Sequence, residues 1–440
     1  MFGLTPDTVI RDSLYDLIPL SREAAAILAT PEFLRLDGIQ QLGFVSRVWP
    51  GAKHTRFEHS LGVMHLMQVA LTHLNERGAG IPDETARVAI AAALLHDIGH
   101  YPFSHAIEEL GSPIASHEQV GRRIVTETEV ASVLREQWQI DPQRVAQLIS
   151  PNGATLPDGD RLVRGLLSGA LDVDKLDYLP RDARACHVPY GGVDTARLMA
   201  ALRVIDIDDQ PSIGIDAKGI SPLHSLINAR QEMFDNVYWH HTNRACMAML
   251  LRAVQEAVVA GMPPQQLTSH NDASLLATLS STDAPMPTQR LIDALARRRI
   301  HKRAVEISAR AGELFRYLGS LFDHPGQRRA IENVMVSQLR HLTGKSVEHG
   351  DILIDIPKPE RWRTDVWVQF DDPPIGFSPL MSWNDVAGGA PEQLKTYEEH
   401  RRLIRIVCVE PLRADVRQHW QRLLLPLLAS PAAIETLGAR

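Results

Sequence analysis

The chain has 440 residues, of which 44% are hydrophobic and 22% are charged, and its formal net charge is -7. This length exceeds what one hydrophobic core usually fills, so we expect a large domain and a smaller one. The composition is that of a soluble globular protein and excludes wholesale disorder. The acidic balance argues against nucleic-acid binding, because a general grip on phosphates needs a basic surface.

Cysteine usage and the N-terminal sequence bear on the cellular compartment. Cys186, Cys246 and Cys408 lie far apart and follow no CxxC pattern, which favours reduced thiols over a disulfide framework. No window approaches about 18 uninterrupted apolar residues, and no basic stretch leads into an apolar run at the N-terminus. We therefore expect a cytoplasmic protein with no membrane partner.

The first 340 residues are predicted to be mostly helical. From about residue 20 to 200, apolar residues recur at three- and four-residue spacing. Residues 203–216 instead alternate apolar and polar side chains around an Asp-Asp-Gln-Pro turn, which predicts a β-hairpin. Helical periodicity then returns over about 222–260 and again over 288–318.

The pattern changes after about residue 345. Three segments, 351–356, 366–370 and 404–409, are typical of strands, and an amphipathic helix is predicted over 412–425. We therefore expect a mainly α protein with a small hairpin insertion, divided into a helical domain over 1–340 and a smaller α+β domain over 341–440.

An apolar segment that ends in His96, Asp97 and His100 carries the clearest chemical signal. A single buried histidine is more often a core residue than a metal ligand. A cluster of three polar side chains at the end of an apolar helix is not explained by core packing alone. Imidazole nitrogen beside carboxylate oxygen suits a divalent cation, and the absence of cysteine ligands argues against structural zinc. The segment therefore predicts a metal site.

Two further blocks accompany this doublet. They read Thr-Arg-Phe-Glu-His-Ser-Leu-Gly over 55–62 and Ser-Gly-Ala-Leu-Asp-Val-Asp-Lys-Leu-Asp-Tyr-Leu-Pro-Arg-Asp over 168–182. With all three blocks the chain resembles the HD-domain superfamily, and within it the dGTPase-like deoxynucleoside triphosphate triphosphohydrolases. The resemblance extends over about 35–310 and only loosely beyond. It implies an HD-type helical bundle with core motifs at 41–182 and a second substrate wall at 222–260.

The resemblance implies a metal centre and a second catalytic group. Its metal ligands fall on His59, His96, Asp97 and Asp174, and the ion would be Mg, Mn, Fe or Zn. Asp172 is expected to cap a helix or to support a ligand. The second group falls on His100, His117, Glu108 and Glu118. His117 could donate a proton to the leaving oxygen, with Glu108 orienting it; the alternative for Glu108 is a solvated helix residue.

The resemblance also implies a nucleotide site. The residues that it assigns to phosphate, sugar and base contacts are Gln41, Leu42, Arg56, Lys175, Tyr178, Asp182, Arg230 and Tyr238. Without the motif, Lys175 and Asp182 would be interpreted as charged residues on a solvent-exposed helix face. Pro180 lies between them and could kink their helix. Phe234 departs from the family pattern, where relatives have histidine, so the base preference is expected to differ.

Expected partners are a small-molecule nucleotide and further copies of the chain, because relatives assemble as oligomers. The basic run Arg297–Arg303 resembles a region that meets a nucleotide effector in some relatives; the alternative is a solvated helix face. The leading hypothesis is hydrolysis of a dNTP to a deoxynucleoside and tripolyphosphate. The alternatives are another HD-family nucleotidase or phosphodiesterase, and a catalytically silent nucleotide-sensing module.

Overall fold

The computed structural model describes residues 2–151, 153–358, 365–387 and 401–429. Its longer helices are α3 (Arg56–Glu76), α4 (Asp83–Leu95), α5 (His117–Glu127), α8 (Asp158–Leu167), α9 (Val173–Cys186), α11 (Ile220–Met233), α12 (His241–Val259), α14 (Met286–Ala296), α16 (Pro325–Thr343) and α19 (Arg413–Leu424). The shorter ones are α1 (Arg22–Leu28), α2 (Pro31–Leu34), α6 (Glu129–Glu136), α7 (Pro142–Ile149), α10 (Thr195–Ala200), α13 (Asp272–Leu279), α15 (Glu313–Ser320), α17 (Trp383–Ala387) and α20 (Pro426–Ala429). The predicted mainly α fold is confirmed. None of the helices among these residues is long and apolar enough to cross a membrane.

Within the described ranges, three small sheets accompany the helices. The strands are β1 (Pro6–Asp12), β2 (Asp16–Ser21), β3 (Leu202–Ile207), β4 (Gln210–Asp216), β5 (Lys302–Ile307), β6 (Ile352–Asp355), β7 (Trp367–Gln369), β8 (Leu380–Ser382) and β9 (Ile404–Cys408). Their orders are β1-β2, β3-β4-β7-β8 and β5-β9-β6. The predicted hairpin is confirmed as β3 and β4, which pair antiparallel.

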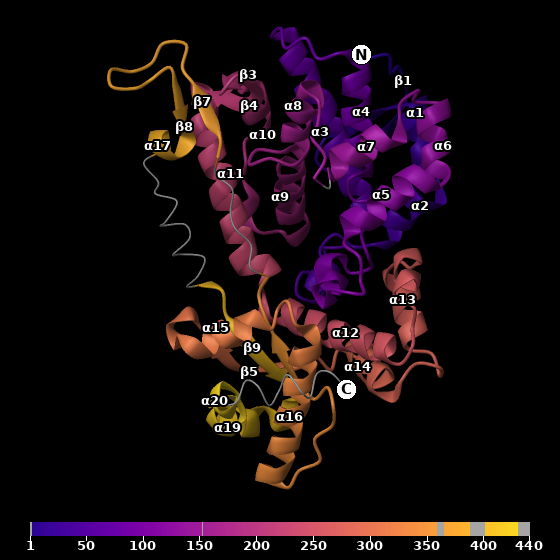
Figure 1. Cartoon of the computed structure of the whole chain (residues 1–440), viewed down its shortest axis with the longest axis vertical. Helices are drawn as coiled ribbons and strands as arrows, with labels where there is room; N and C mark the ends of the chain where they lie inside the picture. The colour runs from indigo at the N-terminus through magenta and orange to yellow at the C-terminus, as the bar shows by residue number, and fades with distance from the viewer. Residues whose placement is uncertain (1, 152, 359–364, 388–400, 430–440) are drawn as a thin grey trace.

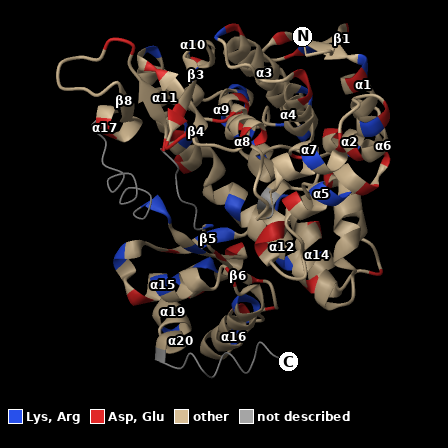
Figure 2. Cartoon of the chain, turned by 45° about the horizontal axis from the view of Figure 1, so that its top comes forward, with Lys and Arg blue, Asp and Glu red and all other residues tan. Residues whose placement is uncertain are grey.

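The core of the N-terminal half lies around α3, which packs against α4 and α9. The side chains of α3 at the predicted three- and four-residue spacing are buried: Leu61, Met64, Met67, Leu71 and Leu74. Figure 1 shows these helices in the upper part of the molecule, with α12, α14, α16 and the β5-β9-β6 sheet in the lower part. Figure 2 shows acidic and basic residues interspersed over both parts.

The segment 288–318 differs from its prediction as continuous helix. Strand β5 separates α14 from α15, because residues 302–307 pair antiparallel with β9, about a hundred residues later in the chain. One hydrophobic cluster joins residues on both sides of position 340, among them Leu318, Leu339, Ile352 and Ile406. β5, α15 and α16 therefore share a core with the C-terminal strands, and the expected domain boundary at 340 stays a prediction.

Strand β7 also lies elsewhere than expected. Residues 366–370 were predicted to belong to the C-terminal α+β unit, but β7 pairs in parallel with β4 through Ile215 and Val368. Val366 and Val368 are buried in the same cluster as α3 and α9. This strand therefore extends the hairpin sheet of the helical body.

Candidate active site

The turn that follows α4 and the start of α3 bring the first metal-ligand candidates together. Helix α3 begins at Arg56, and the backbone N–H of Thr55 donates to the Glu58 carboxylate at 2.9 Å, which fixes its first turn. His59 therefore lies one turn inside a buried helix. Helix α4 ends at Leu95, so His96 stands at its C-cap.

Four predicted metal ligands converge at this point. Ligand atoms of His59, His96 and Asp174 all lie within 4.8 Å of one another. Asp97 lies beside them, with its carboxylate oxygens 3.7 Å from Nε2 of His59 and 3.4 Å from Nε2 of His96. Asp174 comes from the first turn of α9, so three separate segments supply this set.

The tautomers of the two histidines suit a cation. Nδ1 of His59 donates to Asp177 at 2.7 Å, and Nδ1 of His96 donates to the carbonyl of Ala93 at 2.8 Å. Nε2 of each ring therefore faces the acids. Nε2 of His96 is buried and has no hydrogen-bond partner among the described residues. Two imidazoles and two carboxylates fit a divalent ion of the borderline or hard type.

The charges at this centre are tuned by burial and by their neighbours. Without an ion, burial would lower the pKa of His59, but hydrogen bonds to Asp174 and Asp177 outweigh it and raise the pKa to about 10. A bound ion would therefore replace the proton on Nε2 of His59. Burial would raise the pKa of Asp97, yet Arg56, His96 and His100 hold it well below its usual value. Asp97 is therefore ionised, as a metal ligand must be.

His100, His117 and Glu108 form a second cluster beside the first. The His100 and His117 rings stack with centroids 4.0 Å apart, and Nδ1 of His117 lies 2.8 Å from Oε1 of Glu108. Helix α5 can approach this closely because residue 99 is glycine: a Cβ there would collide with the backbone of His117 and Gly121. His100 also lies 3.1 Å from Asp97, which links the two clusters.

Glu108 sets the protonation of His117. Burial would lower the pKa of His117, but the hydrogen bond and the charge of Glu108 raise it. An acid with a raised pKa is protonated below that pKa and loses its proton as the pH rises through it. We expect Glu108→Gln to lower this pKa, which would move the alkaline limb of the kcat profile to lower pH. The measurement is kcat against pH, with Glu127→Gln at the exposed end of α5 as the control. An unchanged alkaline limb would contradict the pairing.

Both clusters open into one cavity of about 510 Å³. The predicted site residues that line it are Gln41, Leu42, Arg56, His96, Asp97, His100, His117, Glu118, Asp174, Lys175, Tyr178, Asp182, Arg230 and Tyr238. His59 and Glu108 do not line the cavity and support its wall. A volume of this size holds a molecule as large as a nucleotide.

Two predicted phosphate contacts are paired with acids. Arg56 forms a close ion pair with Asp97. Nζ of Lys175 lies 2.5 Å from Asp172 and 3.0 Å from the carbonyl of Gly169. Asp172 is also the N-cap of α9, as predicted, and accepts from the backbone N–H of Lys175. Both cations lie at the cavity wall, where an anionic ligand would compete with these carboxylates.

Asp182 and Tyr238 are joined to each other and to a histidine that the sequence interpretation missed. The Tyr238 hydroxyl donates to Oδ2 of Asp182 at 2.7 Å, and Nε2 of His54 lies 2.7 Å from Oδ1. Helix α9 continues through Pro180, so Lys175 and Asp182 do face the same cavity. His54 lies two residues before Arg56, and only its position near the first block could have drawn attention to it.

The second wall differs in local structure from the continuous helix predicted over 222–260. Arg230 lies on α11, but Phe234–Tyr238 form a π-helical turn and α12 begins at His241. Such turns occur often at functional sites. Phe234 stacks on Trp239 with centroids 5.9 Å apart, and both line the cavity.

Comparison with known protein families and relatives places the same residues in an HD domain. Residues 56–181 match the HD domain, and residues 193–372 match the HD associated region. The chain is 31% identical over 369 residues to an uncharacterized protein of Methanocaldococcus jannaschii, covering 83% of this chain and 72% of that protein. The chain belongs to the HD-domain superfamily, and it is a metal-dependent phosphohydrolase that resembles the dNTP triphosphohydrolases.

Two further proteins are similar to this chain, one in sequence and one in fold. The chain is 29% identical over 279 residues to the human deoxynucleoside triphosphate triphosphohydrolase SAMHD1, covering 57% of this chain but only 44% of the human protein. A phosphohydrolase structure from Bacteroides thetaiotaomicron superposes with a TM-score of 0.70 at 24% identity, covering 92% of this chain and 100% of that one. The second likeness shows the fold.

Proposed function

We propose that the chain hydrolyses dNTPs to a deoxynucleoside and tripolyphosphate. One observation carries this proposal: a single cavity of about 510 Å³ joins three of the metal-ligand candidates, His96, Asp97 and Asp174, and His117 to the cations Arg56, Lys175 and Arg230. The likeness to a relative named as a dNTP triphosphohydrolase supports it. A divalent ion, when bound, polarises a phosphate oxygen and activates water.

The protein side chains would bind the substrate and move its protons. Arg56 and Lys175 would contact the phosphates, since each is a basic residue at the cavity wall. His117, held protonated by Glu108, would donate a proton to the leaving oxygen. Tyr178, Asp182 and Arg230 complete the nucleotide site.

The test is a panel of dNTPs and NTPs incubated with Mg²⁺ or Mn²⁺. Release of tripolyphosphate would support attack at the α-phosphorus. Release of pyrophosphate or phosphate would favour the alternative HD-family nucleotidase. No hydrolysis of any nucleotide by a metal-loaded chain would favour a silent sensing module.

A preference for dNTPs is expected from the wall formed by Gln41, Leu42 and Tyr238. A 2′-hydroxyl enclosed there without a partner costs roughly 1–3 kcal/mol, and steric overlap with the Tyr238 ring would add to this cost. The expected preference in kcat/KM is therefore at least about tenfold, at about 1.4 kcal/mol per decade. Tyr238→Ala should relax this preference by opening the wall. Tyr238→Phe is the matched control, because it keeps the ring and removes only the hydroxyl that donates to Asp182. The measurement compares kcat/KM for dGTP with GTP; equal wild-type values would refute the wall.

We also propose that a nucleotide effector binds at Arg297–Arg303 and that several copies of the chain assemble. Arg297 and Arg299 pair with Asp293 on an exposed surface, and Arg298 donates to the carbonyl of Arg47. The exposed charges are compatible with an effector and equally with a solvated helix end. Sedimentation with and without dGTP would distinguish the two.

A further inference from the structure

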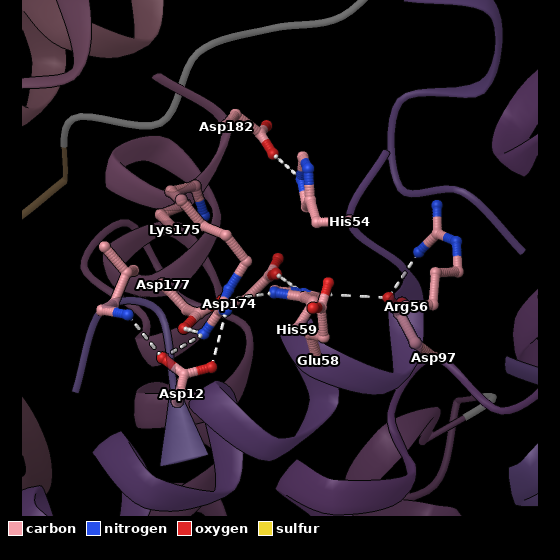
Figure 3. A network of polar contacts seen from close by, with 12 residues as sticks. Asp12, His54, Arg56, Glu58, His59, Asp97, Asp174, Lys175, Asp177 and Asp182 are labelled. Carbon is pink, nitrogen blue, oxygen red and sulfur yellow. Dashed lines mark hydrogen bonds and ion pairs between the residues drawn. The ribbon is translucent and has the colours of Figure 1, made fainter. Parts of the chain in front are cut away.

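A buried series of charged side chains joins the N-terminal hairpin to a metal ligand. Nδ1 of His59 donates to Asp177 at 2.7 Å. Arg181, one turn further along α9, donates to Asp177 from Nε at 2.8 Å and from Nη2 at 2.9 Å. Its Nη1 donates to Asp12 at 2.8 Å, and Asp12 is the last residue of β1. Figure 3 shows Asp12, Asp177 and His59 in the same network of polar contacts. We refer to His59, Asp177, Arg181 and Asp12 as the relay.

Every member of the relay is excluded from water. The side chains of Asp12, Arg181, Asp177 and His59 are 4%, 2%, 0% and 1% exposed. Buried charges of this kind persist only when each is paired, because an unpaired one costs several kcal/mol. The guanidinium of Arg181 pairs with two carboxylates at once, so its position and charge depend on both.

The neighbouring helix leaves space for the relay. Gly62 lies on α3 three residues after His59, and a Cβ at this position would collide with the carboxylate of Asp177 and the guanidinium of Arg181. Glycine in the middle of a helix lowers the stability of the helix relative to alanine. Close approach of the relay to α3 accounts for glycine at this position.

Asp12 ties an otherwise exposed strand to the metal centre. Most residues of β1 are exposed, and the ion pair between Arg11 and Asp16 near its end lies in solvent. Asp12 alone among the charged residues of the β1–β2 hairpin reaches a residue of α9 in the described ion pairs. The placement of the hairpin and the orientation of His59 therefore depend on the same guanidinium.

We propose that Asp12 and Arg181 are positioning residues of the metal site, through which the N-terminal hairpin controls metal affinity. Asp177 holds the His59 ring so that Nε2 faces the ion, Arg181 holds Asp177, and Asp12 supplies the second counter-charge of Arg181. Because coupling between two sites is reciprocal, a bound ion should also stabilise the docked hairpin. This inference rests on the metal-binding part of the proposed function.

The effect of Asp12 can be bounded from the behaviour of other metal sites. Loss of a group that directly supports a ligand costs about 10- to 100-fold in metal affinity. Asp12 acts two residues further out, behind Asp177 and Arg181, so we expect a loss at the lower end of that range, about 10-fold. Without Asp12, Arg181 would be neutralised by Asp177 alone, which makes Asp177 a weaker acceptor for the His59 N–H.

The test measures Mn²⁺ binding to the full chain after chelation, with no nucleotide present. Asp12→Asn should weaken Mn²⁺ about 10-fold and reduce the Tm gain on adding Mn²⁺. The matched control is Asp16→Asn in the same hairpin, whose side chain is 75% exposed and pairs only with Arg11 among the described residues. Affinities for Mn²⁺ within twofold of each other in the two variants would overturn the proposal.

A second variant keeps the test decisive if Asp12→Asn does not fold. Arg181→Lys retains the positive charge between the two carboxylates but loses the forked geometry, so it should weaken Mn²⁺ binding several-fold in a folded protein. Wild-type affinity in this variant would overturn the relay. A chain that binds Mn²⁺ and responds to these changes but hydrolyses no dNTP would refute the proposed function alone. A wild-type chain that binds none of Mn²⁺, Fe²⁺ and Zn²⁺ would refute both.

Discussion

Replacing His96 with alanine is expected to remove bound metal and to lower kcat/KM by about 10³-fold or more. The reason is that Lewis-acid stabilisation is worth several kcal/mol, and each 1.36 kcal/mol corresponds to tenfold in rate. The fold should survive, because the His96 side chain makes one hydrogen bond, to the carbonyl of Ala93, among the described residues. Asp97→Ala should also abolish turnover. It additionally removes the carboxylate that pairs with the buried Arg56, which destabilises the fold.

The measurement is metal content by elemental analysis together with steady-state kinetics. His341→Ala, at an exposed histidine near the end of α16, is the control for the loss of an imidazole. Retention of both metal and activity in the His96→Ala and Asp97→Ala proteins would show that the doublet does not bind the ion.

The second large effect is expected at His117. His117→Ala should lower kcat by about 10²–10⁴-fold, the usual contribution of a general acid, with the metal content intact. The structure supports this separation, because His117 belongs to the second cluster, where it stacks on His100 and pairs with Glu108. Lys175→Ala should raise KM as well, since Lys175 lies at the cavity wall.

Kinetics at saturating and limiting dNTP would distinguish chemistry from binding. Gln119→Ala, exposed two residues further along α5, is the matched control and should leave kcat unchanged. Equal and small losses in His117→Ala and Lys175→Ala would instead favour a surface histidine and a solvated lysine.

Part of the fold was predictable because its signals are local. Apolar spacing predicted α3, and alternation around a turn predicted β3 and β4, since both patterns arise from neighbours in the sequence. β5 was missed because its partner β9 lies about a hundred residues away, and its six residues lie between two helical segments. A short strand of this kind is stabilised by pairing that no local window contains.

The candidate site shows the same division. Motif blocks located His59, His96, Asp97 and Asp174, and the structure brings these four together from three segments. His54 was missed because its partner Asp182 lies 128 residues away. Nothing in the local sequence distinguishes His54 from a surface histidine.

The sequence by itself determined the helical class, the HD blocks and the residue types that a metal centre needs. The tertiary structure alone decided which groups support them: Asp177 behind His59, and Asp12 behind Arg181 across 169 positions of sequence. The physical reason is that local periodicity is governed by residues within a few positions. The stability of a buried charge depends instead on an opposite charge within hydrogen-bond distance, and only the packing of the whole chain supplies that partner.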